Sequence, residues 1–100
     1  MESIEICINN LYSEIILFID VKNSLVRFLN KEKKIERDLI DELVRIIRNW
    51  DREYHKSNII DSERFLIKIT TNNGVDIIKG SGIYPDNYNA FKELVGKIYE

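Results

Sequence analysis

The chain has 100 residues, of which 44% are hydrophobic and 32% are charged, and its net charge is −2 with both signs interspersed. This composition is typical of one globular domain spanning residues 1–100, and it excludes a disordered chain. The charge balance lacks the strong positive excess of a general nucleic-acid binder, and it is too weak and too mixed for a polyanion mimic.

The single cysteine, Cys7, cannot form a disulfide within the chain, which favours a reducing compartment. The start of the chain shows no basic-then-apolar leader, and no apolar run approaches the ~20 residues needed to cross a bilayer. The sequence therefore predicts a cytoplasmic protein that does not enter a membrane.

The first part of the chain predicts a β-hairpin. In residues Ser3–Ile8, isoleucines alternate with other residues, as is typical of a half-buried strand. Asn9 and Asn10 then favour a turn. The apolar run over Glu14–Asp20 predicts the second strand, although a short run of this kind is also compatible with a helix.

Two helices are predicted next. Asn23 or Ser24 is suited to cap a short helix over Leu25–Asn30, and a charged corner at residues 31–34 follows it. Residues Ile35–Tyr54 then carry apolar side chains at steps of three and four, which predicts an amphipathic helix of about five turns. Its apolar residues are Ile35, Leu39, Ile40, Leu43, Val44, Ile46, Ile47, Trp50 and Tyr54. A stripe of this width needs a sheet to cover it.

The clearest β signal is a hairpin over residues 64–79, where Asn-Gly separates two β-favouring runs. Two registers are open at this point. A three-residue loop with Gly74 in a bulge sets Ile69 opposite Ile77, whereas a two-residue Asn-Gly loop sets it opposite Ile78.

The last predicted element is a helix that opens at residues 84–87, with a proline near its first turn. Its predicted inward residues are Tyr88, Phe91, Leu94, Val95 and Ile98. Gly96 within it suggests close backbone packing. The order β-β-α-α-β-β-α predicts an α+β fold, in which a four-stranded, mainly antiparallel sheet packs against a long amphipathic helix and a C-terminal helix.

Reactive side chains are few. His55 is the only histidine, and it could in principle pair with Cys7 as a catalytic Cys–His site. No motif surrounds either residue. The simpler interpretation is a solvated histidine and a small structural cysteine. No spacing suits a zinc or EF-hand site. Gly80-Ser-Gly82 lacks the lysine and the longer glycine spacing of a phosphate loop.

Two carboxylate pairs are present, Asp51 with Glu53 and Asp61 with Glu63. Paired carboxyls can divide acid and base roles only when burial separates their pKa values. Because these pairs lie among cations at predicted turns, we expect a solvated face there. The sequence therefore predicts no catalytic residue, no cofactor site and no metal site.

Two surface features are candidate partner-binding sites. Arg45, Arg48 and Arg52, with Lys56 beyond them, step along one side of the predicted long helix and suit phosphates or an acidic protein. A solvated helix face is the simpler alternative. Tyr84 and Tyr88 form a tyrosine cluster at the start of the last helix. The simpler alternative is that Tyr84 is a hydrophobic staple for this helix and Tyr88 fills the edge of the core. With the hairpin tip, the predicted partner-binding residues are Arg45, Arg48, Arg52, Asn72, Asn73, Tyr84, Asp86 and Tyr88.

A series of short motifs runs through the second half of the chain. It comprises Trp50-x-x-x-Tyr54, Phe65-Leu-Ile-Lys-Ile, Asn73-Gly74, Gly80-x-Gly82 and Tyr84-Pro-Asp-Asn-Tyr88-x-x-Phe91. Over residues 46–98 this series resembles a small uncharacterised bacterial and phage domain. The resemblance brings no catalytic residues with it, and it implies only a context of short accessory proteins that are often encoded with mobile elements.

A compact, charged chain without a catalytic motif favours a non-enzymatic, protein-binding inhibitor. We expect a phage or mobile-element anti-defence protein of the anti-CRISPR type, or a toxin-immunity protein, that covers a site on a defence nuclease complex or a toxin. The alternative is a nucleic-acid-binding accessory or regulatory protein that uses the arginine stripe. A nucleotide-binding or hydrolytic enzyme is the least favoured class. Monomer and homodimer both remain open, since a long exposed edge strand would favour pairing.

Overall fold

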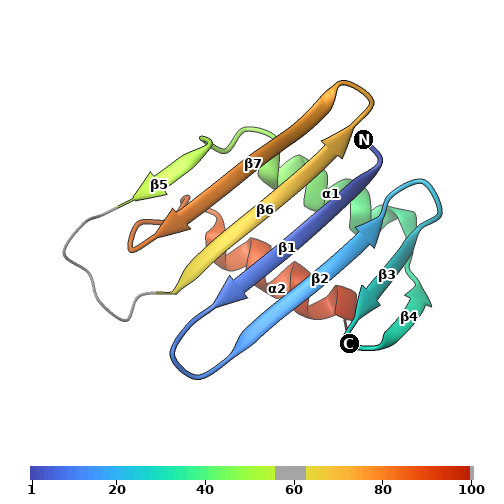
Figure 1. Cartoon of the computed structure of the whole chain (residues 1–100), viewed down its shortest axis with the longest axis horizontal. Coiled ribbons are helices and arrows are strands. Elements are labelled where there is room, and N and C mark those ends of the chain that lie inside the picture. The colour runs from blue at the N-terminus through green and yellow to red at the C-terminus, as the bar shows by residue number, and fades with distance from the viewer. Residues whose placement is uncertain (56–62, 100) are drawn as a thin grey trace.

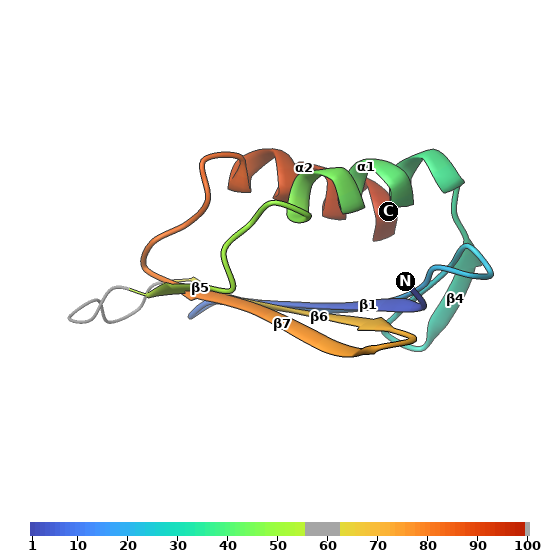
Figure 2. The same cartoon turned by 90° about the horizontal axis from the view of Figure 1, so that it is seen from above.

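The computed structural model describes residues 1–55 and 63–99. Its elements, in chain order, are β1 (Ser3–Asn9), β2 (Glu14–Asp20), β3 (Leu25–Phe28), β4 (Lys31–Lys34), α1 (Arg37–Ile47), β5 (Glu53–His55), β6 (Arg64–Thr71), β7 (Gly74–Ser81) and α2 (Tyr88–Tyr99). Figure 1 shows the strands side by side in one sheet, and Figure 2 shows both helices on the same side of it. The fold is α+β, but the predicted four-stranded sheet with a long helix is wrong. The described residues form a seven-stranded sheet with two short helices.

The sheet has the strand order β4-β3-β2-β1-β6-β7-β5. β1 lies at its centre and pairs antiparallel with β2 on one side and with β6 on the other. Among the described strands, only β5 runs parallel to its neighbour, β7. The central strand therefore joins an N-terminal meander, β1 to β4, to the C-terminal strands (Figure 1).

The predicted first hairpin is confirmed as β1 and β2. Alternation buries Ile4, Ile6 and Ile8 against the helices, each with at most 3% of its surface exposed. The turn is fixed by Asn10, whose side-chain oxygen accepts hydrogen bonds from the backbone N–H groups of Tyr12 and Ser13. This is the local bonding that makes asparagine favourable in turns.

The predicted helix over Leu25–Asn30 is wrong. Its residues form β3 and a tight turn into β4, with Val26 buried and Arg27 on the opposite face. The turns at both ends require a positive φ, 53° at Ser24 and 58° at Leu29, which non-glycine residues adopt only occasionally. Four residues are too few for a period of two to be distinguished from a helical period. The charged corner at residues 31–34 is the exposed edge strand β4.

The predicted helix over Ile35–Tyr54 is wrong in length. α1 ends at Ile47, and Arg48 closes it by donating its backbone N–H to the carbonyl oxygen of Val44 at 2.9 Å. The chain then turns away and returns to the sheet as β5. The apolar stripe is real, since Ile40 and Leu43 are fully buried, but it covers only the eleven residues of α1.

Tertiary contacts of Trp50 explain why the helix stops early. Its indole N–H donates to the side-chain oxygen of Asn87 at 2.7 Å. Its ring lies edge-on against Phe65 and Phe91, with ring centroids 5.7 and 5.1 Å away. Edge-to-face aromatic pairs add about 0.5–1.5 kcal/mol each beyond the area they bury. A helix continued through Trp50 would forfeit these contacts, and tertiary packing contributes more to helix stability than propensity does.

The predicted hairpin over residues 64–79 is confirmed, but neither expected register is correct. The loop consists of the two asparagines, so Ile69 lies opposite Asp76 and Ile67 lies opposite Ile78. Ile67 and Ile78 are both fully buried beneath the helices. The register is thus set by the burial of a cross-strand isoleucine pair rather than by the Asn-Gly step.

The C-terminal helix is confirmed as α2. All five predicted inward residues are buried, namely Tyr88, Phe91, Leu94, Val95 and Ile98. The expectation of close backbone packing at Gly96 is wrong, because a Cβ at that position would meet nothing within 4 Å.

Candidate binding surface

The side of the sheet away from the helices is uncovered, and we call it the open face (Figure 2). Its side chains are those that alternate with the buried ones along each strand. They include Glu5 and Cys7 in β1, Ile16 and Phe18 in β2, Leu66 and Lys68 in β6, and Ile77 and Lys79 in β7. The register arranges them in rows that cross the strands.

One of these rows is apolar. Cys7 pairs with Ile16 of β2 and with Leu66 of β6, so the three side chains lie next to one another across the sheet. Ile16 is 60% exposed and Leu66 is 39% exposed. We call these three residues the apolar row. Large contiguous patches of exposed apolar side chains are uncommon on monomeric proteins and often mark interaction sites.

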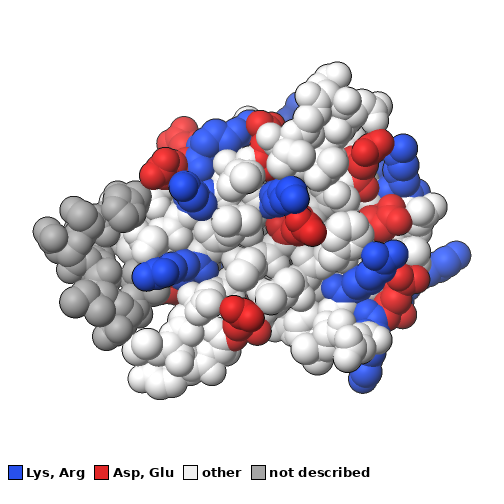
Figure 3. Space-filling model, viewed as in Figure 1, with Lys and Arg blue, Asp and Glu red and all other residues white. Residues whose placement is uncertain are grey.

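The next row carries charges that neutralise one another. Lys68 lies 3.6 Å from the carboxylate of Glu5, and Arg27 of β3 lies 2.7 Å from that of Glu32 in β4. The guanidinium of Arg27 also lies over the ring of Phe18, 5.3 Å from its centroid. Figure 3 shows basic and acidic side chains close together on this face, with uncharged surface between them. The open face therefore carries no strong field of one sign.

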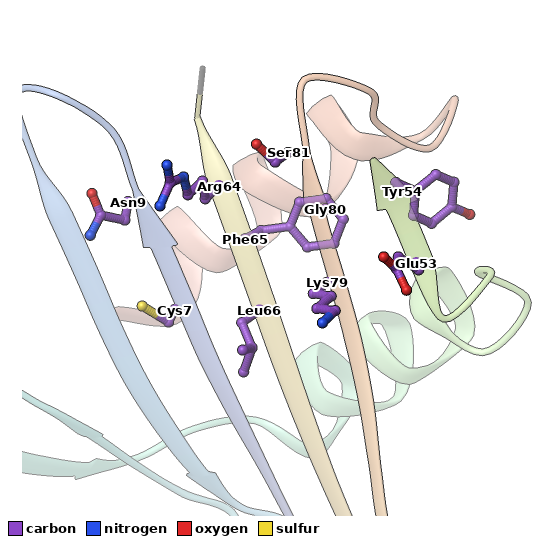
Figure 4. Close-up of a pocket in the computed structure, with 10 residues that line it drawn as sticks. All are labelled: Cys7, Asn9, Glu53, Tyr54, Arg64, Phe65, Leu66, Lys79, Gly80 and Ser81. Atoms are coloured by element: carbon purple, nitrogen blue, oxygen red, sulfur yellow. The ribbon is translucent and has the colours of Figure 1, made fainter. Parts of the chain in front are cut away.

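A groove of about 460 Å³ lies between the apolar row and the row on its other side (Figure 4). One wall holds Cys7, Leu66, Lys79 and Glu53, and the other holds Asn9, Arg64 and Ser81. Within the described residues, neither Arg64 nor Lys79 is held in an ion pair. The groove thus combines apolar contacts with two uncommitted cations.

Gly80 supports the groove from below. A Cβ at this position would clash with Cε1 of Phe65 and lie 3.1 Å from Cβ of Tyr54. Phe65 is 2% exposed and lies in an aromatic cluster with Trp50 and Tyr88. The absent side chain at Gly80 is therefore explained by close packing on the aromatic cluster, which accounts for this glycine without a phosphate loop.

Cys7 in the groove wall is not arranged as a nucleophile. Partial burial raises the pKa of its thiol, and the negative charge of Glu14 raises it further. A reactive cysteine needs the opposite shift, because the thiolate is the attacking species. The side chain of His55, which the sequence allowed as a partner of Cys7 but did not favour, lies outside the described part of the structure.

A polar cluster around Glu63 was not predicted in this form. The carboxylate of Glu63 accepts hydrogen bonds from the hydroxyl of Tyr88 (2.6 Å), the ammonium of Lys92 (3.0 Å) and the amide of Asn10 (3.3 Å). Partial burial alone would raise the pKa of Glu63, but these bonds outweigh it and lower the pKa below its ordinary value. Burial and the carboxylate together raise the pKa of Tyr88. Asp61, the predicted partner of Glu63, lies outside the described residues.

The structure brings together three of the predicted partner-binding residues. Arg45, Tyr84 and Asp86 line one polar hollow of about 440 Å³ between the end of α1 and the segment before α2. Arg52 does not lie on the helix, and its guanidinium is 3.4 Å from the carboxylate of Asp76. Lys56 falls outside the described residues.

The remaining predicted residues are dispersed. Arg48 is exposed at the end of α1, and Tyr88 is only 6% exposed, so Tyr88 is mainly a core residue. Asn72 and Asn73 form the tip of the β6–β7 hairpin, at the opposite end of the sheet from the segment before α2 (Figure 1). One continuous surface formed by all eight residues is therefore not observed.

Two kinds of feature are absent from the described residues. They contain no group of three or more histidine, cysteine, aspartate or glutamate side chains placed to hold a metal ion. Within the same residues, neither helix has the length and apolar character needed to span a bilayer.

No protein-family model and no curated protein sequence matches this chain. Its function must therefore be inferred from the surfaces described above.

Proposed function

We propose that this chain is a non-enzymatic protein-binding domain that engages its partner through the open face of the sheet. The observation that supports this proposal is the apolar row, whose Ile16 and Leu66 are 60% and 39% exposed beside the groove. Apolar side chains at the centre of a patch with polar residues around them are the usual composition of a protein interface. Arg64 and Lys79, which form no ion pair with another described residue, would add charge complementarity to an acidic group on the partner.

A protein partner is favoured over nucleic acid by the charge pattern of this face. A polyanion needs a track of uncompensated cations, and single strands also need exposed aromatic rings on which bases stack. On the open face, Lys68 and Arg27 are compensated by carboxylates, so Arg64 and Lys79 do not extend into a track of cations across it. Phe18 lies beneath Arg27. The predicted arginine stripe, which motivated the nucleic-acid alternative, loses its last member where α1 ends.

For its biological role we propose inhibition by occlusion, in the manner of an anti-defence or toxin-immunity protein. What supports this role is the sparse chemistry of the chain together with a broad, uncovered sheet face. A domain of this kind alters a partner's activity by covering its site, and its specificity comes from complementary shape and charge.

The proposal can be tested by affinity capture with paired baits. The wild-type protein and the double variant Ile16→Arg/Leu66→Arg would be incubated with nuclease-treated lysate of the source organism, and bound proteins would be quantified by mass spectrometry. A control bait with Asp38→Arg raises the net charge by the same two units as the double variant, at an exposed position of α1. We expect a partner that the wild type and the control retain and that the open-face variant loses, with at least a tenfold weaker Kd when the purified pair is measured.

Capture that survives in the open-face variant but fails in the α1 control would overturn the proposed surface. Capture that appears only when the nuclease treatment is omitted would instead favour the alternative function.

A further inference from the structure

The two edges of the sheet differ in how they are protected. At one edge, β4 has the sequence Lys-Glu-Lys-Lys, and all four side chains are exposed. Charged edge strands of this kind discourage the addition of another strand. At the other edge, β5 pairs only with Lys79–Ser81 of β7. Among the described residues, no strand lies beside residues 74–78 on their outer side.

The backbone of β7 presents hydrogen-bonding groups at this uncovered stretch. The N–H of Lys79 points outward, since it donates to the carbonyl oxygen of Arg52 at 3.1 Å. Because successive residues of a strand direct these groups to opposite sides, Val75 and Ile77 also direct theirs outward. Their side chains lie on the open face and are 52% and 47% exposed. This edge carries no lysine between Gly74 and Ile78.

We propose that residues 73–77 of this edge pair with the same edge of a second copy of the chain. Outward N–H and C=O groups at the spacing of a β-strand are matched by another extended polypeptide. The β4 edge of a second copy is excluded by its charges. Pairing of β7 with β7 remains, and it is isologous, so it closes as a two-fold dimer rather than growing into a fibre.

The register of this pairing follows from two restrictions. A two-fold axis at Ile77 would require the outward groups of Lys79, whose N–H is already bonded to Arg52. An axis at Asp76 would set the two Asp76 carboxylates opposite each other, which is destabilising for like charges.

An axis at Val75 keeps the backbone bond between Lys79 and Arg52 and separates the Asp76 carboxylates. It requires only that the N–H of Asn73 leave the Oγ1 of Thr71, to which it donates at 3.2 Å on the exposed turn. It sets Val75 opposite its own copy, Ile77 opposite Asn73 and Asp76 opposite Gly74 of the second chain. Axes nearer the hairpin tip would pair fewer residues. The antiparallel arrangement makes one continuous sheet with both open faces on the same side, so the dimer presents two binding surfaces together.

The size of the contact predicts its strength. Pairing of five residues buries less area than the ~1,200–2,000 Å² of stable interfaces. We therefore expect a weak dimer that forms in a concentration-dependent manner, and this expectation is independent of any partner held on the open face.

Sedimentation analysis of the purified full chain tests the dimer. From about 10 μM to about 1 mM chain, a range that brackets weak association, we expect the mean mass of the wild type to rise towards that of a dimer. Val75→Lys sets two ammonium groups opposite each other and should stay monomeric over this range. Tyr12→Lys places the same charge on a 93% exposed residue at the β1–β2 turn and should dimerise like the wild type.

Disulfide trapping tests the register in a Cys7→Ser background. Under mild oxidation, Val75→Cys should cross-link to itself, and Ile77→Cys should cross-link to Asn73→Cys when the two are mixed. Asp76→Cys alone should not cross-link efficiently.

A wild type that remains monomeric at about 1 mM overturns the proposal, as does a dimer that persists unchanged in Val75→Lys. Efficient self-cross-linking of Asp76→Cys without that of Val75→Cys overturns the register.

Discussion

The two faces of the sheet are built from the same strands, but one is buried beneath the helices and the other is exposed. Phe65 and Leu66 are neighbours in β6, yet Phe65 is 2% exposed in the aromatic cluster and Leu66 is 39% exposed in the apolar row. The covered face is fixed by packing, since its large side chains belong to one buried hydrophobic core. The open face carries exposed apolar residues such as Leu66, and this difference is what supports the proposed binding surface.

The largest expected effect on stability comes from comparing two adjacent residues that lie on opposite faces of the sheet. Phe65→Ala should lower the free energy of unfolding by about 3–5 kcal/mol, because it removes a buried ring and leaves a cavity. Leu66→Ala should lower it by less than about 1 kcal/mol, because the side chain is already partly in water. Urea denaturation of both variants measures the difference, and equal losses would contradict the assignment of the two faces.

The next largest effect on stability is expected at Gly80, the glycine beneath the groove. Gly80→Ala places a Cβ against the ring of Phe65 and should destabilise the fold by about 1–3 kcal/mol through overpacking. Gly96→Ala is the matched control, since its Cβ meets nothing and alanine is favoured in helices. Thermal unfolding of the two variants should shift Tm in opposite directions. If Gly80→Ala left Tm unchanged, the side chains of the aromatic cluster would have to rearrange at little cost in free energy.

A smaller effect on stability is expected at Glu63, which lies before β6 and is hydrogen-bonded to side chains of α2. Glu63→Gln should cost about 1–2 kcal/mol at neutral pH, because the neutral amide accepts weaker bonds from Tyr88 and Lys92. The pKa of Glu63 is lower in the folded state than its ordinary value of 4.5, so its stabilising contribution is complete above that value. It is lost as the pH falls through the lowered pKa.

Stability curves of wild type and Glu63→Gln measured from neutral to acidic pH test this linkage. The difference between them should shrink as the pH drops below about 4.5. A difference that stays constant with pH would mean that the carboxylate charge contributes nothing.

The smallest effect belongs to the charged row of the open face. Lys68 and Glu5 are roughly half exposed, and pairs of this kind contribute about 0.2–1 kcal/mol that salt screens. A double-mutant cycle of Lys68→Ala and Glu5→Ala at low and high salt measures the coupling. A coupling that salt leaves unchanged would indicate a pair less accessible to solvent than its exposure implies.

Elements with a long, regular pattern were predictable from the sequence. The isoleucine alternation of β1 and the apolar spacing of α2 repeat often enough to exclude other periods, and both are confirmed. The errors lie where tertiary contacts decide. α1 ends without a glycine or proline signal because Trp50 packs into the aromatic cluster, and β3 is flanked by non-glycine residues with positive φ. β5 has three residues, which is too short for any pattern.

The open face was missed because strand patterns do not show which side a helix will cover. One signal was available. An antiparallel strand with one solvated face should alternate apolar and polar residues, yet β2 reads Glu-Ile-Ile-Leu-Phe-Ile-Asp. Ile16 and Phe18 occupy positions where polar residues are expected. They therefore mark the side of the sheet that carries apolar side chains although neither α1 nor α2 covers it.

The central position of β1 has a consequence for synthesis. Its Ser3 pairs with Asp20 but also with Thr70, so the middle of the sheet joins segments separated by most of the chain. On the ribosome, β1 to β4 can pair locally, but one flank of β1 stays unsatisfied until β6 has emerged. Folding is therefore expected to be slow for a domain of this size, and the nascent meander is a natural client for chaperones.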